Sequence, residues 1–385
     1  MKSKKILVIV RDDASSTKTW SGIPFHIIRI LKDYGHEVVV LDKIGFPRSL
    51  AWKTRRVLGL LSKSFAPKYY SNVAAKYYGK LLSEKLKQYE NKIDFIFAVD
   101  FTEALAFVET KIPLFVYRDA SYALLNKINY PGFEFPNLDI EKELIPFEKS
   151  CLERIDKVFL TSSWAIEETK KFYPELSSDK YVVQPFSSQL YPPPVSTDWK
   201  EREIASGGVM KFLFVGRDWV RKGGDRAIEI LNKVKNLGVK PEMTIVGCKP
   251  DFTKAEFEVS CIENLDVSLE KDYKVLRELY LTSHFFILPT VIEAFGIVFS
   301  EAMSLGLPVI TNDVCAISEI LESGIQGLLI SDRNDATAVA QQIVKLKNSP
   351  ESYRAMQNQA FERFSSHFHP KVWVERLIKE SETSL

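Results

Sequence analysis

The sequence lacks several features that mark common classes of protein. Its 385 residues include only four cysteines, none in a C-x-x-C spacing, which predicts reduced thiols in a cytosol. No apolar run approaches the ~20 residues that cross a bilayer, and the apolar stretch 6–10 is too short for a signal-peptide core. The net charge of +2 gives no general reason to expect nucleic acid as a partner. We therefore expect a cytoplasmic protein that does not bind nucleic acid.

The composition is that of a folded globular protein. Hydrophobic residues make up 45% of the chain and charged residues 26%, which excludes a disordered chain. A chain of 385 residues is too long for one ordinary domain and suits two.

Basic residues are concentrated in one stretch, 48–87. It contains ten lysines and arginines and a single acidic residue, Glu84, interleaved with aromatic and aliphatic side chains. Such a stretch suits contact with anionic lipid at the inner face of the cytoplasmic membrane. The alternative is a helix with one solvated basic face and its other face in the core. The sequence leaves both open.

Short apolar runs alternate with longer amphipathic ones, which is typical of parallel sheets wrapped by helices. In the first half, strands are expected at 5–10, 36–42, 94–100, 113–118, 157–162 and 180–186. Helices are expected at 23–34 and 163–173, the second capped by Ser163. The three consecutive prolines at 192–194 fit neither a helix nor a central strand and indicate a stiff linker.

The alternation starts again after this linker. Strands are expected at 211–216, 242–247, 265–269, 284–289, 308–311 and 327–330, and helices at 224–236, 271–281 and 296–304. The predicted fold class is α/β, with two Rossmann-like doubly wound domains facing a central cleft. The predicted boundaries are 1–190, a linker 191–208, 209–368, and a C-terminal helix 369–385 that packs back on the N-terminal domain.

Two carboxylates flank an expected helix start in the second half. Glu293 lies in the loop before Gly296, and Glu301 lies in the second turn after it. The first N–H groups of a helix favour an anion, and glycine lets the backbone approach it closely. A phosphate would take these N–H groups while the carboxylates accept hydrogen bonds from sugar hydroxyls. The alternative is that both glutamates only sit favourably near a helix start.

A second loop carries two cations. Arg217 and Lys222 follow the expected strand 211–216 and precede another helix start at Gly223 and Gly224. Such cations at a strand end suit a diphosphate, because arginine binds phosphate oxygens in bidentate fashion. Together with the two glutamates they indicate a ligand composed of a sugar, a diphosphate and a nucleoside.

These motifs resemble a known family. Glu293 and Glu301, preceded by "LPT" and followed by "EAMSLGLPVI", resemble the signature of glycosyltransferase family 4, whose retaining, nucleotide-sugar-dependent enzymes have the GT-B fold. The stretch "FVGRDWVRKGG" resembles the first loop of that family's C-terminal domain, and "GIQGLLI" a later strand. The match runs through residues 209–335. In the first domain, the loop around Gly22 resembles the family's glycine loop.

The resemblance implies a role for each matched residue. Arg217 and Lys222 would hold the donor diphosphate, Glu301 the ribose hydroxyls and Glu293 the donor sugar. The implied donor-binding set is Gly22, Arg217, Lys222, Glu293, Phe295, Gly296, Ile297 and Glu301. The predicted catalytic set is Glu293, Arg217 and Lys222, which match the family's motifs, together with Asp119, which does not.

The sequence departs from the family pattern in two places. Ala294 stands where many members have glycine, which is a mild change. Asp119 stands at the end of the fourth strand, where many members carry a histidine. Asp119 would accept a hydrogen bond from a sugar hydroxyl or act as a base, or it is the N-cap of the following helix.

The resulting hypothesis is a retaining glycosyltransferase without metal or other cofactor. No D-x-D motif occurs in the chain, so a carboxylate-held cation has no obvious site. The expected donor is a nucleoside-diphosphate hexose, UDP first and GDP next. The expected acceptor is a glycan or lipid-linked saccharide of cell-surface polysaccharide or lipopolysaccharide synthesis.

Three alternatives compete with this hypothesis. A dinucleotide oxidoreductase needs a glycine-rich turn directly after the first strand, and no glycine follows that strand until Gly22. A nucleotide-sugar epimerase of the same fold would turn over the donor without an acceptor. A non-catalytic nucleotide-sugar-binding partner would bind the donor without turnover.

Overall fold

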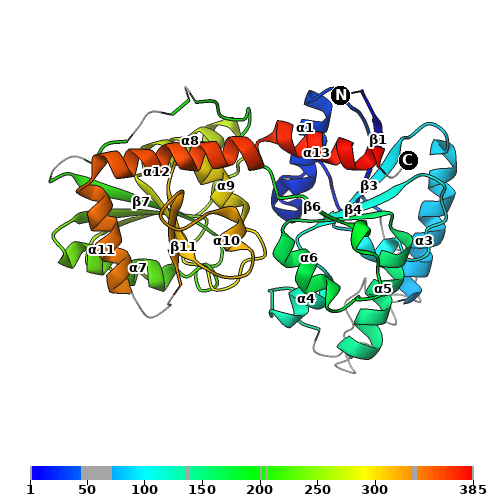
Figure 1. Cartoon of the computed structure of the whole chain (residues 1–385), viewed down its shortest axis with the longest axis horizontal. Coiled ribbons are helices and arrows are strands. Elements are labelled where there is room, and N and C mark those ends of the chain that lie inside the picture. Colours follow the sequence, from blue (N-terminus) through cyan, green and yellow to red (C-terminus); the bar gives the residue numbers. More distant parts are fainter. Residues whose placement is uncertain are drawn as a thin grey trace. The chain divides into compact units, whose positions relative to one another are not determined.

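A computed structural model describes residues 2–44, 72–135, 139–196, 198–199, 202–204, 207–331 and 336–383. The chain forms two compact units. Unit 1 is Met1–Pro185 with Val374–Leu385, and unit 2 is Phe186–Trp373. Each unit contains a six-stranded parallel sheet with helices around it (Figure 1). The predicted α/β class with two doubly wound domains is confirmed for each unit, while the cleft between them stays a prediction.

The sheet of unit 1 has the order β2-β1-β3-β4-β5-β6, with every pair parallel. Its strands are β1 (Lys5–Val10), β2 (Glu37–Leu41), β3 (Phe95–Val99), β4 (Leu114–Arg118), β5 (Lys157–Leu160) and β6 (Tyr181–Val183). β3 and β4 are buried along their whole length, as continuous apolar runs require in a sheet covered on both faces. The strand order reverses between β1 and β3. This is the position where open α/β sheets bind ligands.

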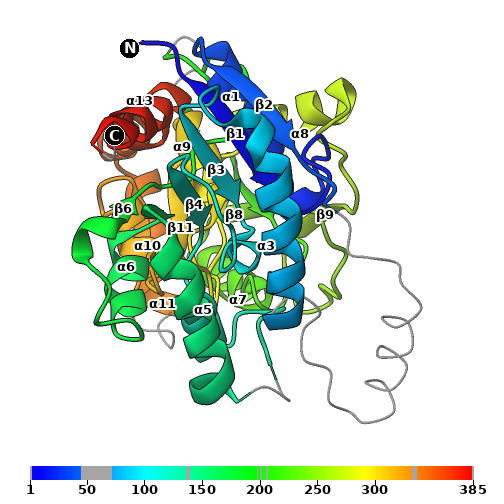
Figure 2. The same ribbon diagram turned by 90° about the vertical axis from the view of Figure 1, so that its right-hand side faces the viewer.

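The helices of unit 1 follow its strands in turn. They are η1 (Thr19–Gly22), α1 (Ile23–Asp33), α3 (Asn72–Leu86), η2 (Lys87–Tyr89), η3 (Thr102–Ala104), α4 (Tyr122–Lys127), η4 (Ile140–Leu144), α5 (Ile145–Arg154), α6 (Ser163–Lys170) and η5 (Ser178–Lys180). Figure 2 shows α3 and α5 together on one face of the strands. The predicted cap of α6 is wrong by one residue, because the Ser162 side chain accepts the Ala165 N–H at 3.0 Å.

Helix α13 (Pro370–Glu382) carries the chain back into unit 1 from Val374 onward. Its apolar side chains Val374, Leu377 and Ile378 are buried. Ion pairs of 3.9 Å join Glu382 to Lys4 and Glu380 to Lys157, both in unit 1. The end of this helix is therefore part of the first unit's core.

The sheet of unit 2 has the order β12-β11-β10-β7-β8-β9, again all parallel. Its strands are β7 (Val209–Val215), β8 (Lys240–Val246), β9 (Glu258–Ile262), β10 (Phe285–Ile287), β11 (Val309–Asn312) and β12 (Gly327–Ile330). The order reverses between β7 and β10. The predicted strand at 265–269 is wrong: this segment is a turn in which Asp266 accepts hydrogen bonds from Ser268, and the edge strand lies earlier, as β9.

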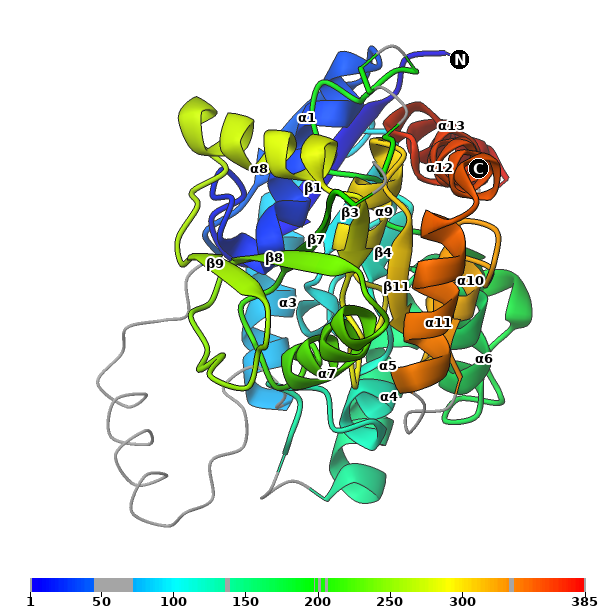
Figure 3. The same cartoon turned by 90° about the vertical axis from the view of Figure 1, so that its left-hand side faces the viewer.

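The helices of unit 2 are α7 (Gly224–Asn236), α8 (Glu270–Thr282), α9 (Ile297–Ser304), α10 (Ile317–Ile320), α11 (Ala336–Lys347), α12 (Pro350–Arg363) and η6 (Phe364–Phe368). Figure 3 shows α7 and α11 side by side. Arg202 fixes the ends of two other helices. Its buried guanidinium donates to the carbonyls of Tyr280 and Leu281 at the end of α8 and of Leu305 and Gly306 after α9.

The basic stretch 48–87 is described only from residue 72 onward, where it forms α3. Tyr78, Leu82 and Leu86 of this helix are buried, whereas Lys76 and Lys80 are exposed. This part has the amphipathic character of a helix with one solvated basic face. Residues 48–71 lie outside the described part of the chain, and membrane contact stays a prediction. Among the described helices, none combines the length and apolar character needed to span a membrane.

Candidate functional site

Two loops meet at the point where the strand order of unit 2 reverses. The first, 216–223, connects β7 to α7, and the second, 288–296, connects β10 to α9. β7 and β10 are hydrogen-bonded neighbours. Because both strands are parallel, both loops leave the same edge of the sheet, where ligands bind in this class of fold. The residues expected to hold a diphosphate and a donor sugar are therefore brought together.

The backbones of the two loops are joined directly. The carbonyl of Arg221 accepts the Val291 N–H at 2.8 Å and the Thr290 hydroxyl at 3.1 Å. Gly223 has a φ of +73°, and a Cβ built on it would lie 1.8 Å from the Pro289 carbonyl oxygen. Only glycine permits this approach. The glycine that precedes α7 thus keeps the first loop against the second.

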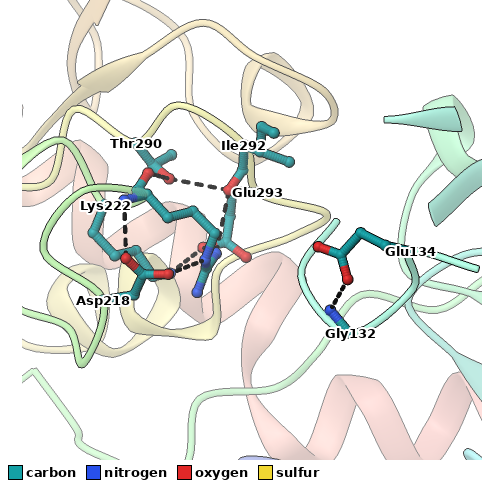
Figure 4. A network of polar contacts seen from close by, with 8 residues as sticks. Gly132, Glu134, Asp218, Lys222, Thr290, Ile292 and Glu293 are labelled. Carbon is teal, nitrogen blue, oxygen red and sulfur yellow. Dashed lines mark hydrogen bonds and ion pairs between the residues drawn. The ribbon is translucent and has the colours of Figure 1, made fainter. Parts of the chain in front are cut away.

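Glu293 lies at the centre of a group of charges between these loops (Figure 4). It is 4% exposed, and its Oε2 is ion-paired with Lys222 Nζ. The same oxygen lies 3.4 Å from Arg221 Nη1, which also donates to the Ile292 carbonyl at 3.2 Å. Asp218 in turn lies 3.4 Å from Arg221 Nε. The buried carboxylate is therefore compensated by two cations, as a buried charge requires.

Arg217 is exposed, unlike the other two cations of this loop, Arg221 and Lys222. Its side chain forms no hydrogen bond or ion pair with any residue in the described ranges, whereas Lys222 and Arg221 are both paired. A guanidinium at the end of β7 without an internal partner is available to an anionic ligand.

Phe295, Gly296 and Ile297 form the start of α9. The Phe295 side chain is buried against Phe186 and Phe368, with ring centroids 5.4 and 6.0 Å away, so only its backbone is suited to ligand contact. Gly296 is the left-handed N-cap of α9, with a φ of +85°. A Cβ there would lie 2.5 Å from the Phe299 ring.

Glu301 lies one turn further along α9 and is 8% exposed. Its Oε2 accepts a hydrogen bond of 3.0 Å from the Tyr280 hydroxyl on α8. Burial raises the pKa of Glu301 from 4.5 to about 7, and the Tyr280 hydrogen bond only partly counteracts this rise. Tyr280 is fully buried and was not among the expected site residues. Its position in the last turn of an amphipathic helix gave no signal that its hydroxyl reaches the site.

In unit 1, Asp119 directly follows β4, whereas Gly22 lies at the start of α1. Gly22 is the buried N-cap of α1 with a φ of +79°, directly after two other left-handed residues, Trp20 and Ser21. The carbonyl of Asp119 accepts the Thr161 hydroxyl at 3.0 Å. The alternative role of Asp119 as a helix cap is wrong, because Ser121 caps α4 by accepting the Leu124 N–H at 3.2 Å.

Unit 1 also contains a charged network that sequence reasoning missed. Its members are Arg11, Asp100, Glu103, Arg118 and Glu148. Arg11 follows β1 and Asp100 follows β3, the two strands between which the order reverses. Glu103, Arg118 and Glu148 are buried, with at most 2% of each side chain exposed. The sequence feature that could have indicated this network is a single charged residue directly after an apolar strand, as Arg11 after β1 and Asp100 after β3.

Hydrogen bonds hold this network in place. Glu103 accepts from Arg11 Nη1 at 3.0 Å and from the Tyr122 hydroxyl, and Glu148 accepts the Tyr122 N–H at 2.6 Å and the Tyr173 hydroxyl at 2.5 Å. Burial raises the pKa of Asp100 to about 6, although Arg118 and Arg11 act in the opposite direction. Its side chain is 23% exposed, so this carboxyl lies at the rim of the network.

Comparison with known proteins identifies the class that the sequence of unit 2 and the fold of the chain resemble. Residues 195–363 match the family model described as "Glycosyl transferases group 1". The resemblance found in the sequence is therefore confirmed at the level of group 1 glycosyltransferases with the GT-B fold. Assignment to family 4 in particular stays a prediction.

Individual relatives agree with this class. The chain is 27% identical to alpha-maltose-1-phosphate synthase of Mycolicibacterium smegmatis over 52% of this chain and 55% of the relative. It is 30% identical to N-acetyl-alpha-D-glucosaminyl L-malate synthase of Bacillus anthracis, over 68% and 57%. It is 27% identical to lipopolysaccharide glucosyltransferase WaaG of Escherichia coli, over 58% and 62%. The chain thus spans roughly half to three-fifths of the length of these relatives.

Solved structures share the fold over the whole chain. A glycosyltransferase from Rickettsia africae superposes with a TM-score of 0.68 at 17% identity, covering 100% of this chain and 99% of that one. The Anabaena protein HepE, solved in complex with UDP and glucose, superposes with a TM-score of 0.63 at 17% identity, covering 99% and 100%. At this level of identity the likeness establishes the fold alone.

Within the described ranges, no group of three or more histidine, cysteine, aspartate or glutamate side chains is arranged to hold a metal ion. The expectation of a metal-independent reaction stays a prediction.

Proposed function

We propose that the protein is a retaining glycosyltransferase that moves a hexose-type sugar from a nucleoside-diphosphate sugar to a glycan or lipid-linked acceptor. The proposed donor nucleotide is UDP, with GDP as the second choice. The observation that carries the proposal is the meeting of Arg217, Lys222, Glu293 and the N-terminus of α9 on two joined loops at the strand-order reversal of unit 2. Glu301 lies one turn into the same helix.

In this proposal the donor lies along the two loops. Arg217 and Lys222 bind the diphosphate, Glu301 accepts hydrogen bonds from the ribose hydroxyls and Glu293 accepts them from the sugar. The backbone N–H groups of 295–297 contact phosphate and sugar, and Gly22 contributes from unit 1. The complex of the structural neighbour HepE with UDP and glucose supports testing UDP first.

Catalysis then depends on stabilising the leaving group. Arg217, Lys222 and the α9 N-terminus place positive charge where the nucleoside diphosphate departs. The acceptor hydroxyl attacks from the face that the leaving group vacates, and the departing phosphate takes its proton, which retains the anomeric configuration. Asp119 accepts a hydrogen bond from the acceptor or the sugar. No metal or other cofactor is needed, because side-chain cations carry the charge.

The proposed acceptor is a saccharide of lipopolysaccharide or other cell-surface polysaccharide synthesis. The relatives' names support this class: one is a lipopolysaccharide glucosyltransferase and another a capsular polysaccharide biosynthesis glycosyltransferase. Contact of residues 48–87 with the inner face of the cytoplasmic membrane would bring a lipid-linked acceptor within reach.

Calorimetric titration with UDP, GDP, ADP and CDP tests the donor site. We expect one nucleotide to bind clearly tighter than the others and Glu301→Ala to weaken it by about tenfold or more, the usual effect of losing a hydrogen bond to a charged group. Glu278→Ala, an exposed glutamate on α8, is the matched control and should leave affinity unchanged. Absence of binding to all four nucleotides would contradict the proposal.

Turnover assays separate the remaining alternatives. Conversion of the donor sugar without any acceptor would favour the epimerase. Tight donor binding with no turnover against any glycan or lipid-linked acceptor would favour a non-catalytic binding partner.

A further inference from the structure

Arg221 connects the two loops of the unit 2 site through both its backbone and its side chain. Its carbonyl accepts the Val291 N–H and the Thr290 hydroxyl. Its guanidinium donates to the Ile292 carbonyl at 3.2 Å and reaches Glu293 Oε2 at 3.4 Å. A single residue of the first loop thus contacts every residue from 290 to 293.

Asp218 fixes the orientation of this guanidinium. Its carboxylate accepts the Arg221 backbone N–H at 3.0 Å and lies 3.4 Å from Arg221 Nε. The planar guanidinium therefore directs Nε toward Asp218 and Nη1 toward the second loop. A lysine ammonium has no second branch and cannot make both contacts from one position.

Lys222 and Arg221 share the same carboxylate oxygen, Glu293 Oε2. A donor diphosphate would compete with that oxygen for Lys222. If Lys222 were the only partner, binding the diphosphate would leave the buried Glu293 carboxylate without a cation, which is strongly unfavourable. Arg221 removes this conflict because it stays paired with Glu293 while Lys222 turns to the phosphate.

We propose that Arg221 is a positioning residue that holds Glu293 in place for the sugar of the donor, so that it determines preference for a nucleotide sugar over the bare nucleotide. This inference rests on the proposed function. It assigns a role to a residue that touches neither phosphate nor sugar and acts only through Glu293 and the 290–293 backbone.

The test compares two ligand pairs, UDP with UDP-glucose and GDP with GDP-mannose, by calorimetry on the full chain. The pair that the wild type binds more tightly is used throughout. We expect Arg221→Gln to weaken nucleotide-sugar binding at least tenfold and to change nucleoside-diphosphate binding less than threefold. Arg221→Lys should restore only part of the loss, because it returns the charge without the branched geometry.

Arg277→Gln is the matched control. Arg277 is a similarly half-buried arginine of unit 2 that pairs with Asp198 at 3.7 Å, and its loss should change neither affinity. Thermal unfolding of each variant shows whether the protein remains folded. If Arg221→Gln is folded and loses affinity equally for both ligands, or for neither, the proposed role of Arg221 is overturned while the proposed function is not. Failure of the wild type to bind any of the four ligands would overturn the proposed function and this inference with it.

Discussion

At the scale of single residues, Glu301 combines burial with a proposed role that requires its charge. Its carboxyl group accepts a hydrogen bond from the Tyr280 hydroxyl and is 8% exposed in α9. Burial raises its pKa from 4.5 to about 7. The carboxylate that we propose to accept hydrogen bonds from ribose is therefore only partly ionised near neutral pH. We expect nucleotide affinity to increase as the pH rises through 7.

The raised pKa also predicts how stability depends on pH. The folded form binds the Glu301 proton more tightly than the unfolded chain, so its stabilising effect is complete below pH 4.5 and is lost as the pH rises through about 7. Glu301→Gln, which stays neutral, should therefore gain stability relative to the wild type between these values. The gain should reach at most about 3 kcal/mol at pH 8, the equivalent of the shift. Urea unfolding at pH 4.5, 6 and 8 measures it.

The control for this measurement is Glu278→Gln on the exposed face of α8. The difference in the free energy of unfolding between this variant and the wild type should be the same at all three pH values. A constant difference for Glu301→Gln as well would mean that this carboxyl titrates normally and that its burial has no energetic consequence.

The motif residues could be predicted from the sequence, but their partners could not. Glu293, Glu301 and Lys222 occur at recognisable spacings. The contacts of Glu301 with Tyr280, and of Glu293 with Arg221, join residues that are far apart in the chain or unremarkable in type. The role of Asp119 was also left open between a site residue and a helix cap, and only the backbone geometry shows that Ser121 caps α4 instead.

At the scale of elements, the close approach of the two site loops depends on Gly223. Gly223→Ala introduces both an unfavourable left-handed residue and a Cβ that would lie 1.8 Å from the Pro289 carbonyl oxygen. We expect a loss of unit 2 stability of more than about 2 kcal/mol and a marked loss of nucleotide affinity, because the loops must separate. Chemical denaturation and calorimetry measure the two effects.

Gly238→Ala separates the cost of a left-handed backbone from the cost of a steric clash of the added Cβ. Gly238 ends α7 with a φ of +84°, and its added Cβ would meet no atom within 4 Å. The cost should be about 1 kcal/mol, from the left-handed backbone alone, with nucleotide affinity unchanged. Equal costs for the two glycine variants would show that Pro289 moves aside freely.

Elements with a strong hydrophobic periodicity were predicted well, and elements with a weak hydrophobic periodicity were not. The strand 5–10 and the helix 224–236 have the predicted bounds, since long apolar or amphipathic patterns leave little choice. The segment 265–269 alternates like a strand, yet Val267 and Leu269 are exposed and Asp266 closes a turn before α8. The true edge strand, β9, is half polar and so lacks the pattern of a buried strand.

At the scale of the whole molecule, the chain contributes its C-terminal end to the unit in which it begins. Leu377 of α13 is fully buried in unit 1. Leu377→Ala should destabilise unit 1 by about 2–5 kcal/mol through the cavity that it leaves. Hydrogen exchange followed by mass spectrometry should show faster exchange in the peptides of β1 and β5, while those of β7 and β10 keep wild-type rates.

Leu231→Ala provides the reciprocal experiment. Leu231 of α7 is equally buried, but in unit 2. Its loss should increase exchange in β7 and leave β1 unchanged. Uniformly faster exchange across both units in either variant would mean that the two units unfold as one.

The sequence by itself determined the two α/β units, most of their strands and the presence of the glycosyltransferase motif in unit 2. These features are local, because apolar periodicity and short spacings record the environment of each residue. The tertiary structure alone decided that Arg221 shares Glu293 with Lys222, that Tyr280 reaches Glu301 and that five charged residues converge in unit 1. Such contacts arise from the order in which strands pair, and that order brings together residues that no sequence spacing relates.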